Sequence, residues 1–377
     1  MRDLFRGVAN RRRGGLGAGV VLLLIAVWVA VPPQAAALPL YASREGATCV
    51  TCHFDPNGGG MRNEFGFYYG RNRHSMGAED RWANVKVTPQ VNDWIRLGLD
   101  TRFMYYASHV KNPSPSPSHN TVSTFFPMEG QMRIALTPLE NLTVIGTQGI
   151  VVESGYPNSY VARELYALFH GFKHGVYFQA GRFRSPFGLR QEDHTSYTRQ
   201  SLPFDSQRED AGVEVGATGK HWFGQFAVTN GAQPFAQNAG AFAAKIGRAA
   251  GSFQFGLSGY ARVYSGVGDV NSWSAYASTT RGPVTVLAEF LGGDLGGSGD
   301  EAAFLELVYR VSRGVNLRGK VDEYDYNIAG VDKYFRYLAE VDLNPMPFTN
   351  IKVSYRHYSA PILPDLDEGF AMLFVPF

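Results

Sequence analysis

The chain has 377 residues, a formal net charge of +2, 14% aromatic residues, only 18% charged residues and 43 glycines. Residues 1–37 hold five arginines and one aspartate, so the rest of the chain carries a net charge of −2, which excludes a nucleic-acid partner because phosphate binding requires an excess of basic side chains. Few charges together with many aromatic residues and glycines favour a membrane β-barrel over a soluble enzyme.

The first 37 residues are typical of an export signal peptide. Arg11–Arg13 supply a basic start, Leu16–Val31 is an apolar run, and Gln34–Ala37 ends in the small residues at which a signal peptidase cleaves. We therefore expect the mature chain to begin at Leu38. A retained anchor helix is the alternative, but the apolar run is short for a span of about 20 residues.

Both cysteines of the chain lie in one pentapeptide, Cys49-Val50-Thr51-Cys52-His53. This C-x-x-C-H pattern is the attachment sequence of c-type haem. Two thiols form thioethers with the haem vinyl groups, and the following histidine ligates the iron. Cys49, Cys52 and His53 are therefore predicted to hold one covalent haem c.

Other uses of a C-x-x-C pair are a thioredoxin-like redox site, half of a zinc site or a local disulfide. A redox pair would need a βαβ setting, which the sequence lacks. Zinc would need further ligands nearby, and no other cysteine exists.

The second axial ligand of the iron has three candidates downstream of the motif. We favour His74, which is far enough along the chain to fold back over the haem, with Met61 and Met76 as alternatives. Two histidines would lower the reduction potential, whereas methionine would raise it. An open iron site, with His74 as a solvated loop residue, is the remaining possibility.

Residues 38–76 form a unit too small to bury a conventional core. The haem would supply most of that core, with Phe54, Phe65, Phe67, Tyr68 and Tyr69 packed around it. We expect this unit to rest against the domain that follows residues 77–91, a linker.

Apolar and polar residues alternate from residue 92 to the C-terminus, as in Ile351–Arg356. A period of two means one apolar and one polar face, which in a membrane barrel meet lipid and lumen respectively. The sequence thus predicts an all-β, transmembrane antiparallel β-barrel of about 16 strands over residues 92–377. The predicted strands are 92–108, 121–136, 141–154, 161–171, 175–184, 210–217, 220–230, 239–248, 252–264, 270–280, 283–291, 301–311, 315–325, 333–343, 347–358 and 367–377.

Short connections follow the even strands and longer ones follow most odd strands, which is the outer-membrane pattern of periplasmic turns and outside loops. An even strand number places both termini on the periplasmic side. The final Phe377 is similar to the C-terminal signature of outer-membrane barrels. A soluble β-sandwich is the alternative, which the signal peptide and the loop asymmetry disfavour.

The third outside loop, residues 185–209, is the longest, and in sixteen-stranded porins this loop often folds into the pore. Its charged residues could bind a metal ion or could simply be solvated; they are Arg190, Glu192, Asp193, His194, Asp205, Arg208 and Glu209. The residues from Gly181 to Gly188 resemble, weakly, a strand-to-loop passage of phosphate-selective-type porins.

The order of signal peptide, single haem motif, short link and barrel resembles the fused monohaem cytochrome c–porins, some of which are outer-membrane ferrous iron oxidases. The Asn63-x-Phe65-Gly66 segment is also similar to that family, whereas Asp55–Gly60 departs from its iron-oxidising members. The resemblance implies that Cys49, Cys52 and His53 hold haem, and it leaves the electron donor open.

We therefore expect an outer-membrane protein, surrounded by lipid, that passes electrons between an extracellular donor or acceptor, with Fe(II) favoured, and a periplasmic electron-transfer cytochrome. The membrane-embedded band is about 25 Å tall, more than one haem spans, so the haem segment should plug the lumen. Inward-facing charges could bind that segment or the haem propionates; they are Arg318, Lys320, Asp322, Arg336, Glu340, Lys352 and Arg356. The alternatives are a passive porin with a haem-bearing gating or docking plug, a haem peroxidase-like enzyme, and a sheath for a separate multihaem cytochrome.

Overall fold

The computed structural model describes residues 40–77, 84, 87–111, 121–149, 162–200, 209–219, 221–231, 239–250, 252–264, 270–294, 299–326, 333–359 and 364–377. The predicted signal peptide and most of the predicted linker lie outside these residues, as do Asp205 and Arg208 of the third loop.

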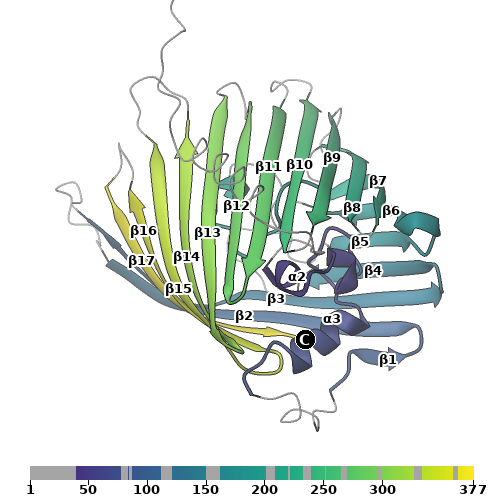
Figure 1. Cartoon of the computed structure of the whole chain (residues 1–377), viewed down its shortest axis with the longest axis horizontal. Coiled ribbons are helices and arrows are strands. Elements are labelled where there is room, and N and C mark those ends of the chain that lie inside the picture. Colours follow the sequence, from purple (N-terminus) through teal and green to yellow (C-terminus); the bar gives the residue numbers. More distant parts are fainter. Residues whose placement is uncertain are drawn as a thin grey trace, which may run out of the picture.

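A closed antiparallel barrel forms most of the described chain (Figure 1). Its sixteen strands are β2 (Ile95–Val110), β3 (Thr121–Leu139), β4 (Leu142–Gly149), β5 (Ala162–Phe169), β6 (Val176–Phe183), β7 (Asp210–Thr218), β8 (Trp222–Thr229), β9 (Ala239–Ala250), β10 (Phe253–Tyr264), β11 (Val270–Arg281), β12 (Val284–Asp294), β13 (Asp300–Ser312), β14 (Val315–Asp325), β15 (Tyr334–Met346), β16 (Thr349–Ser359) and β17 (Leu366–Pro376). Each strand pairs with its sequence neighbour, and β17 pairs with β2 to close the ring. A short strand, β1 (Gln90–Asn92), is added beside β2.

The predicted fold class is confirmed, and each predicted strand corresponds to one of β2–β17. Strand ends agree because the apolar and polar faces alternate as the sequence indicates. On β15, for example, Arg336 and Glu340 are buried toward the lumen, whereas Tyr337 and Val341 are 45% and 37% exposed on the outside. Apolar side chains of the same kind cover the outer face of most strands, which suits contact with lipid.

Tight turns alternate with longer connections around the ring, such as residues 282–283 after β11 and residues 184–209 after β6. Because β2 begins and β17 ends beside each other, both border the turn end of the barrel. The backbone amide of Phe377 donates to the Leu99 carbonyl over 2.6 Å, so the last residue continues the sheet.

Residues 40–77, here called the N-terminal segment, lie inside the curve of the strands (Figure 1). They form α2 (Leu40–Glu45), the 3-10 turn η1 (Cys49–Thr51) and α3 (Glu64–Asn72). The segment is fastened at two levels. Near the turn end, Arg44 donates to Asn316 over 2.9 Å, and deeper in the lumen Asn57 donates to Glu214 over 3.2 Å. No described helix is long and apolar enough to cross a membrane.

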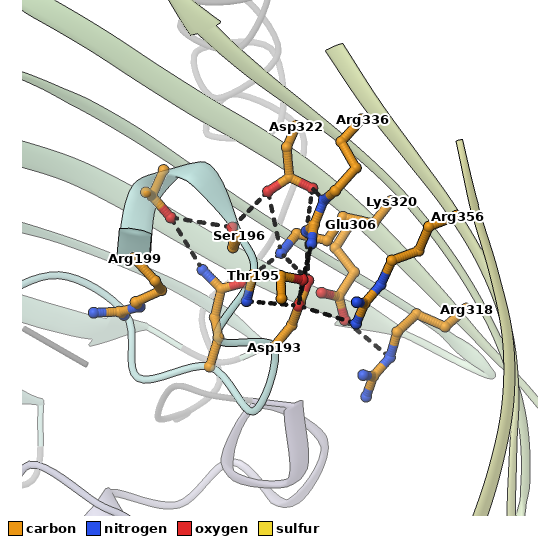
Figure 2. Close-up of polar contacts among 12 residues, drawn as sticks. Asp193, Thr195, Ser196, Arg199, Glu306, Arg318, Lys320, Asp322, Arg336 and Arg356 are labelled. Carbon is orange, nitrogen blue, oxygen red and sulfur yellow. Dashed lines mark hydrogen bonds and ion pairs between the residues drawn. The ribbon is translucent and has the colours of Figure 1, made fainter. Parts of the chain in front are cut away.

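The long connection between β6 and β7 also turns into the lumen, where its helix α4 (Tyr197–Gln200) contacts β12, β13 and β14. Figure 2 shows the carboxylate of Asp193 among basic side chains of the barrel wall. It lies 3.1 Å from Lys320 Nζ and 3.4 Å from Arg356 Nη2, and it also pairs with Arg336.

This arrangement differs from the predicted role of the inward-facing charges. Most of them hold the third loop or one another rather than the N-terminal segment: Lys352 pairs with Glu192 of the loop, and Arg318 pairs with Glu306 and Glu340 of neighbouring strands. The physical reason is that the loop itself carries the carboxylates that these cations require once they are removed from water.

Candidate functional site

The C-x-x-C-H pentapeptide forms a compact turn between α2 and α3 of the N-terminal segment. Its backbone closes on itself, because the amides of Cys52 and His53 donate to the Cys49 carbonyl over 3.1 and 3.0 Å. Cys49 and Cys52 are not joined in a disulfide. The turn therefore holds the two sulfurs and the imidazole on one short stretch of backbone.

Helix α3 packs directly against this turn. The Asn63 side chain caps the helix by accepting from the Gly66 amide over 3.0 Å, and it donates to the Val50 carbonyl over 2.9 Å. A Cβ added at Gly66 would lie 2.0 Å from the Cys52 carbonyl oxygen, so only glycine allows this approach. Asn63 and Gly66 of the Asn63-x-Phe65-Gly66 sequence thus hold α3 against the C-x-x-C-H turn.

Four of the six candidate haem-binding residues, Cys52, His53, Met61 and His74, line one cavity between the N-terminal segment and the barrel wall, and Cys49 and Met76 do not. About 1810 Å³ of this cavity is free of protein atoms, part of it open to solvent. Met76 lies elsewhere. Its backbone amide donates to the Asn344 carbonyl over 2.8 Å, and its side chain packs on Gly314.

Of the three histidines that line the cavity, His53 and His74 each have one buried ring nitrogen without a hydrogen-bond partner in the described chain, Nδ1 in His53 and Nε2 in His74. Burial, together with the nearby Arg62 guanidinium, lowers the pKa of His53 to about 3 and that of His74 to about 3. Both rings are therefore neutral at physiological pH, which is the form that binds a metal. An unsatisfied, neutral imidazole pair fits the axial ligands of a haem iron.

Burial also acts on the two thiols. It raises the pKa of Cys49, and burial with the neighbouring Cys49 raises the pKa of Cys52 to about 11. A thioredoxin-like pair needs a thiol of lowered pKa that reacts as the thiolate. The environment of these cysteines therefore disfavours that alternative and leaves them suited to a covalent structural link.

Aromatic side chains surround the cavity unevenly. The His74 ring meets the Tyr41 ring edge-on at 4.3 Å between centroids, and the Tyr69 ring lies 6.4 Å from His74 and 6.2 Å from Tyr41. Phe67 is buried and stacks on Phe348 at 5.0 Å, near the end of the chain. Of the other aromatic residues expected to pack on the haem, Phe54 is partly buried, but Phe65 and Tyr68 are 47% and 40% exposed.

The third loop does not gather the predicted ion-binding residues. Within the described part of the chain, no group of three or more histidine, cysteine, aspartate or glutamate side chains is placed to hold a metal ion. Glu192 and Asp193 form the ion pairs above, and Arg190, Glu192, His194 and Glu209 line the cavity that holds His53 and His74. Tyr41 and Arg62 were missed by the sequence reasoning, because no motif or periodicity marks them.

No protein-family model and no curated protein matches the sequence. Among solved structures, OprB of Pseudomonas putida is similar over 82% of this chain and 100% of its own, with a TM-score of 0.59 and 7% identity. An anion-selective porin from Comamonas acidovorans matches 75% of this chain and 99% of its own (TM-score 0.57, 9% identity), and OmpT of Vibrio cholerae matches 76% and 99% (TM-score 0.55, 9% identity). At these identities the likeness shows the fold alone: this chain has a porin-type β-barrel.

Proposed function

We propose that this chain is an outer-membrane electron-transfer protein that carries one covalent haem c inside a porin-type barrel. Cys49 and Cys52 would hold the haem, and His53 and His74 would ligate its iron. The observation that supports this assignment most directly is the shared cavity in which the Cys52 thiol meets two neutral imidazoles, each with a buried, unpartnered nitrogen. The bound iron would supply reversible one-electron chemistry.

The chain's own residues position the site. Asn63 and Gly66 fix α3 against the C-x-x-C-H turn, and the Tyr41 and Tyr69 rings lie beside that of His74. The site lies within the ring of strands, with α3 close to the C-terminal Phe377 at the turn end. A periplasmic cytochrome would meet the protein at this end, and an extracellular donor or acceptor at the other. The family resemblance makes Fe(II) the donor to test first.

A second candidate is a passive porin in which the haem-bearing segment gates the pore or docks a partner. It is favoured by the filling of the lumen, where both the N-terminal segment and the third loop contact the wall. A peroxidase-like enzyme would need an open iron position, and the presence of His74 in the cavity argues against it.

The test is an absorption spectrum of the detergent-purified protein, oxidised, then reduced anaerobically with Fe(II) and finally with dithionite. A c-type, six-coordinate low-spin spectrum that reduces with Fe(II) is the expected result. Reduction by dithionite alone would keep electron transfer and discard iron as the donor. Absence of haem in the wild-type protein, with the same spectrum in a C49A/C52A control, would refute the proposal.

A further inference from the structure

Arg62 lines the cavity between the C-x-x-C-H turn and α3. It follows Met61 in the chain and forms an isolated antiparallel β-bridge with His53, so its backbone is tied to the residue proposed as the first axial ligand. Its guanidinium lies against α3, where a Cβ added at Gly70 would be 2.9 Å from Arg62 Nη1. Arg62 therefore projects from the C-x-x-C-H turn across the helix toward the His74 side of the cavity.

The other arginines of this cavity with described contacts have carboxylate partners. Arg133 pairs with Asp100, Arg184 with Glu164 over 3.3 Å, and Arg190 with Asp55 over 2.7 Å. Arg62, in contrast, makes no ion pair or side-chain hydrogen bond within the described chain; Asp100 and Glu192 act on it only through space. Arg62 is half-buried, and a guanidinium with reduced access to water is stabilised by a neighbouring anion.

Arg62 lines the same cavity as Cys52, His53 and His74, and its backbone is bridged to that of His53. Its positive charge also lowers the pKa of both histidines. A haem held in this cavity by the two histidines would therefore share it with the Arg62 guanidinium. Since haem carries two propionate carboxylates, it would bring the missing counter-ion into the cavity.

We infer that Arg62 is a positioning residue that pairs with a haem propionate and, through its positive charge, raises the reduction potential of the haem. This inference rests on the proposed function. The guanidinium can donate two parallel hydrogen bonds to one carboxylate, which fixes the orientation of the group it binds. A positive charge near the iron stabilises the reduced form, which carries one positive charge less than the oxidised form.

The test compares midpoint potentials, measured by spectroelectrochemistry on the full chain in detergent. Two neutral variants, R62Q and R62M, remove the charge; the second also avoids placing a new polar group in the cavity. R62K keeps the charge. R73Q is the matched control, because Arg73 belongs to the same segment but its side chain is 52% exposed, and its distance to the Glu45 carboxylate is 3.9 Å.

The neutral variants should retain a low-spin spectrum and show about a tenfold lower ratio of reduced to oxidised haem at a fixed potential, which is a midpoint about 59 mV lower. R62K and R73Q should stay close to the wild type. A wild-type potential in R62Q or R62M, or an equal drop in R62K, would overturn the inference while leaving the haem in place. Absence of haem from the wild-type protein would instead mean that the proposed function itself is wrong.

Discussion

The Arg190 guanidinium donates to the Asp55 carboxylate over 2.7 Å, and this ion pair joins the inward-folded third loop to the N-terminal segment. Arg190 also donates to the Gly58 carbonyl. The Asp55 side chain is 2% exposed and that of Arg190 is 11% exposed, so neither charge is well solvated. The two structures that fill the lumen are therefore held to each other as well as to the wall.

Neutralising Asp55 should weaken the attachment of the N-terminal segment to the third loop inside the lumen. Removing one partner of a buried ion pair costs about 3–5 kcal/mol, because the other charge is left uncompensated. In D55N we expect more frequent openings and a higher mean conductance in planar bilayers. R73Q, which breaks an exposed pair, should behave like the wild type, since exposed pairs contribute little. Equal conductance in D55N and wild type would show that this pair does not hold the segment.

The close approach of α3 to the C-x-x-C-H turn should be sensitive to one methyl group. In G66A the new Cβ would meet the Cys52 carbonyl oxygen at 2.0 Å, so the helix must move away. Overpacking of this kind costs about 1–3 kcal/mol. We expect the backbone amides of α3 to exchange hydrogen roughly 5–160-fold faster, measured by mass spectrometry.

A matched glycine-to-alanine control is available in the barrel. Gly369 has no atom within 4 Å of an added Cβ, so G369A should leave the exchange of α3 unchanged. If G66A and G369A exchange alike, the turn and α3 are not packed as described.

The third loop should keep its place over a wide pH range. Burial opposes ionisation of Asp193, but Lys320, Arg336 and Arg356 together lower its pKa well below the usual value. A carboxylate with a lowered pKa in the folded protein contributes stability above its unfolded pKa and loses it only as the pH falls through the folded value. Channel conductance should therefore stay constant from pH 7 to pH 5. D193N should show altered conductance at every pH in this range, and a wild-type change near pH 6 would contradict the assignment.

The barrel was predictable because the alternation of apolar and polar residues within each strand shows which side chains face lipid and which face the lumen. Tyr337 faces outward and Arg336 inward because they are adjacent on a strand, and this alternation is visible without any knowledge of the partners. The C-x-x-C-H motif is local in the same way. The strand alternation and the C-x-x-C-H motif can both be read from one sequence without an alignment.

The contacts inside the lumen were not predictable on the same grounds. Arg336 and Asp193 are 143 residues apart, and no periodicity indicates that the loop would reach that strand. The inward charges were therefore recognised but given the wrong partner. Arg62 was missed because no sequence signal shows that it lacks an ion pair with a carboxylate among the described residues. Only the structure shows this.

The choice between His74, Met61 and Met76 as second axial ligand can be decided by substitution. We expect H74A to lose the six-coordinate low-spin spectrum and H74M to raise the midpoint potential, because methionine ligation favours the reduced iron. M76L should have no effect, since Met76 packs on Gly314 outside the cavity. M61L should change the spectrum only slightly, because Met61 is 4% exposed and its sulfur points toward Gly98 of the barrel wall. A high-spin spectrum in M61L with an unchanged one in H74A would assign the ligand to Met61 and make His74 a residue that only packs beside Tyr41 and Tyr69.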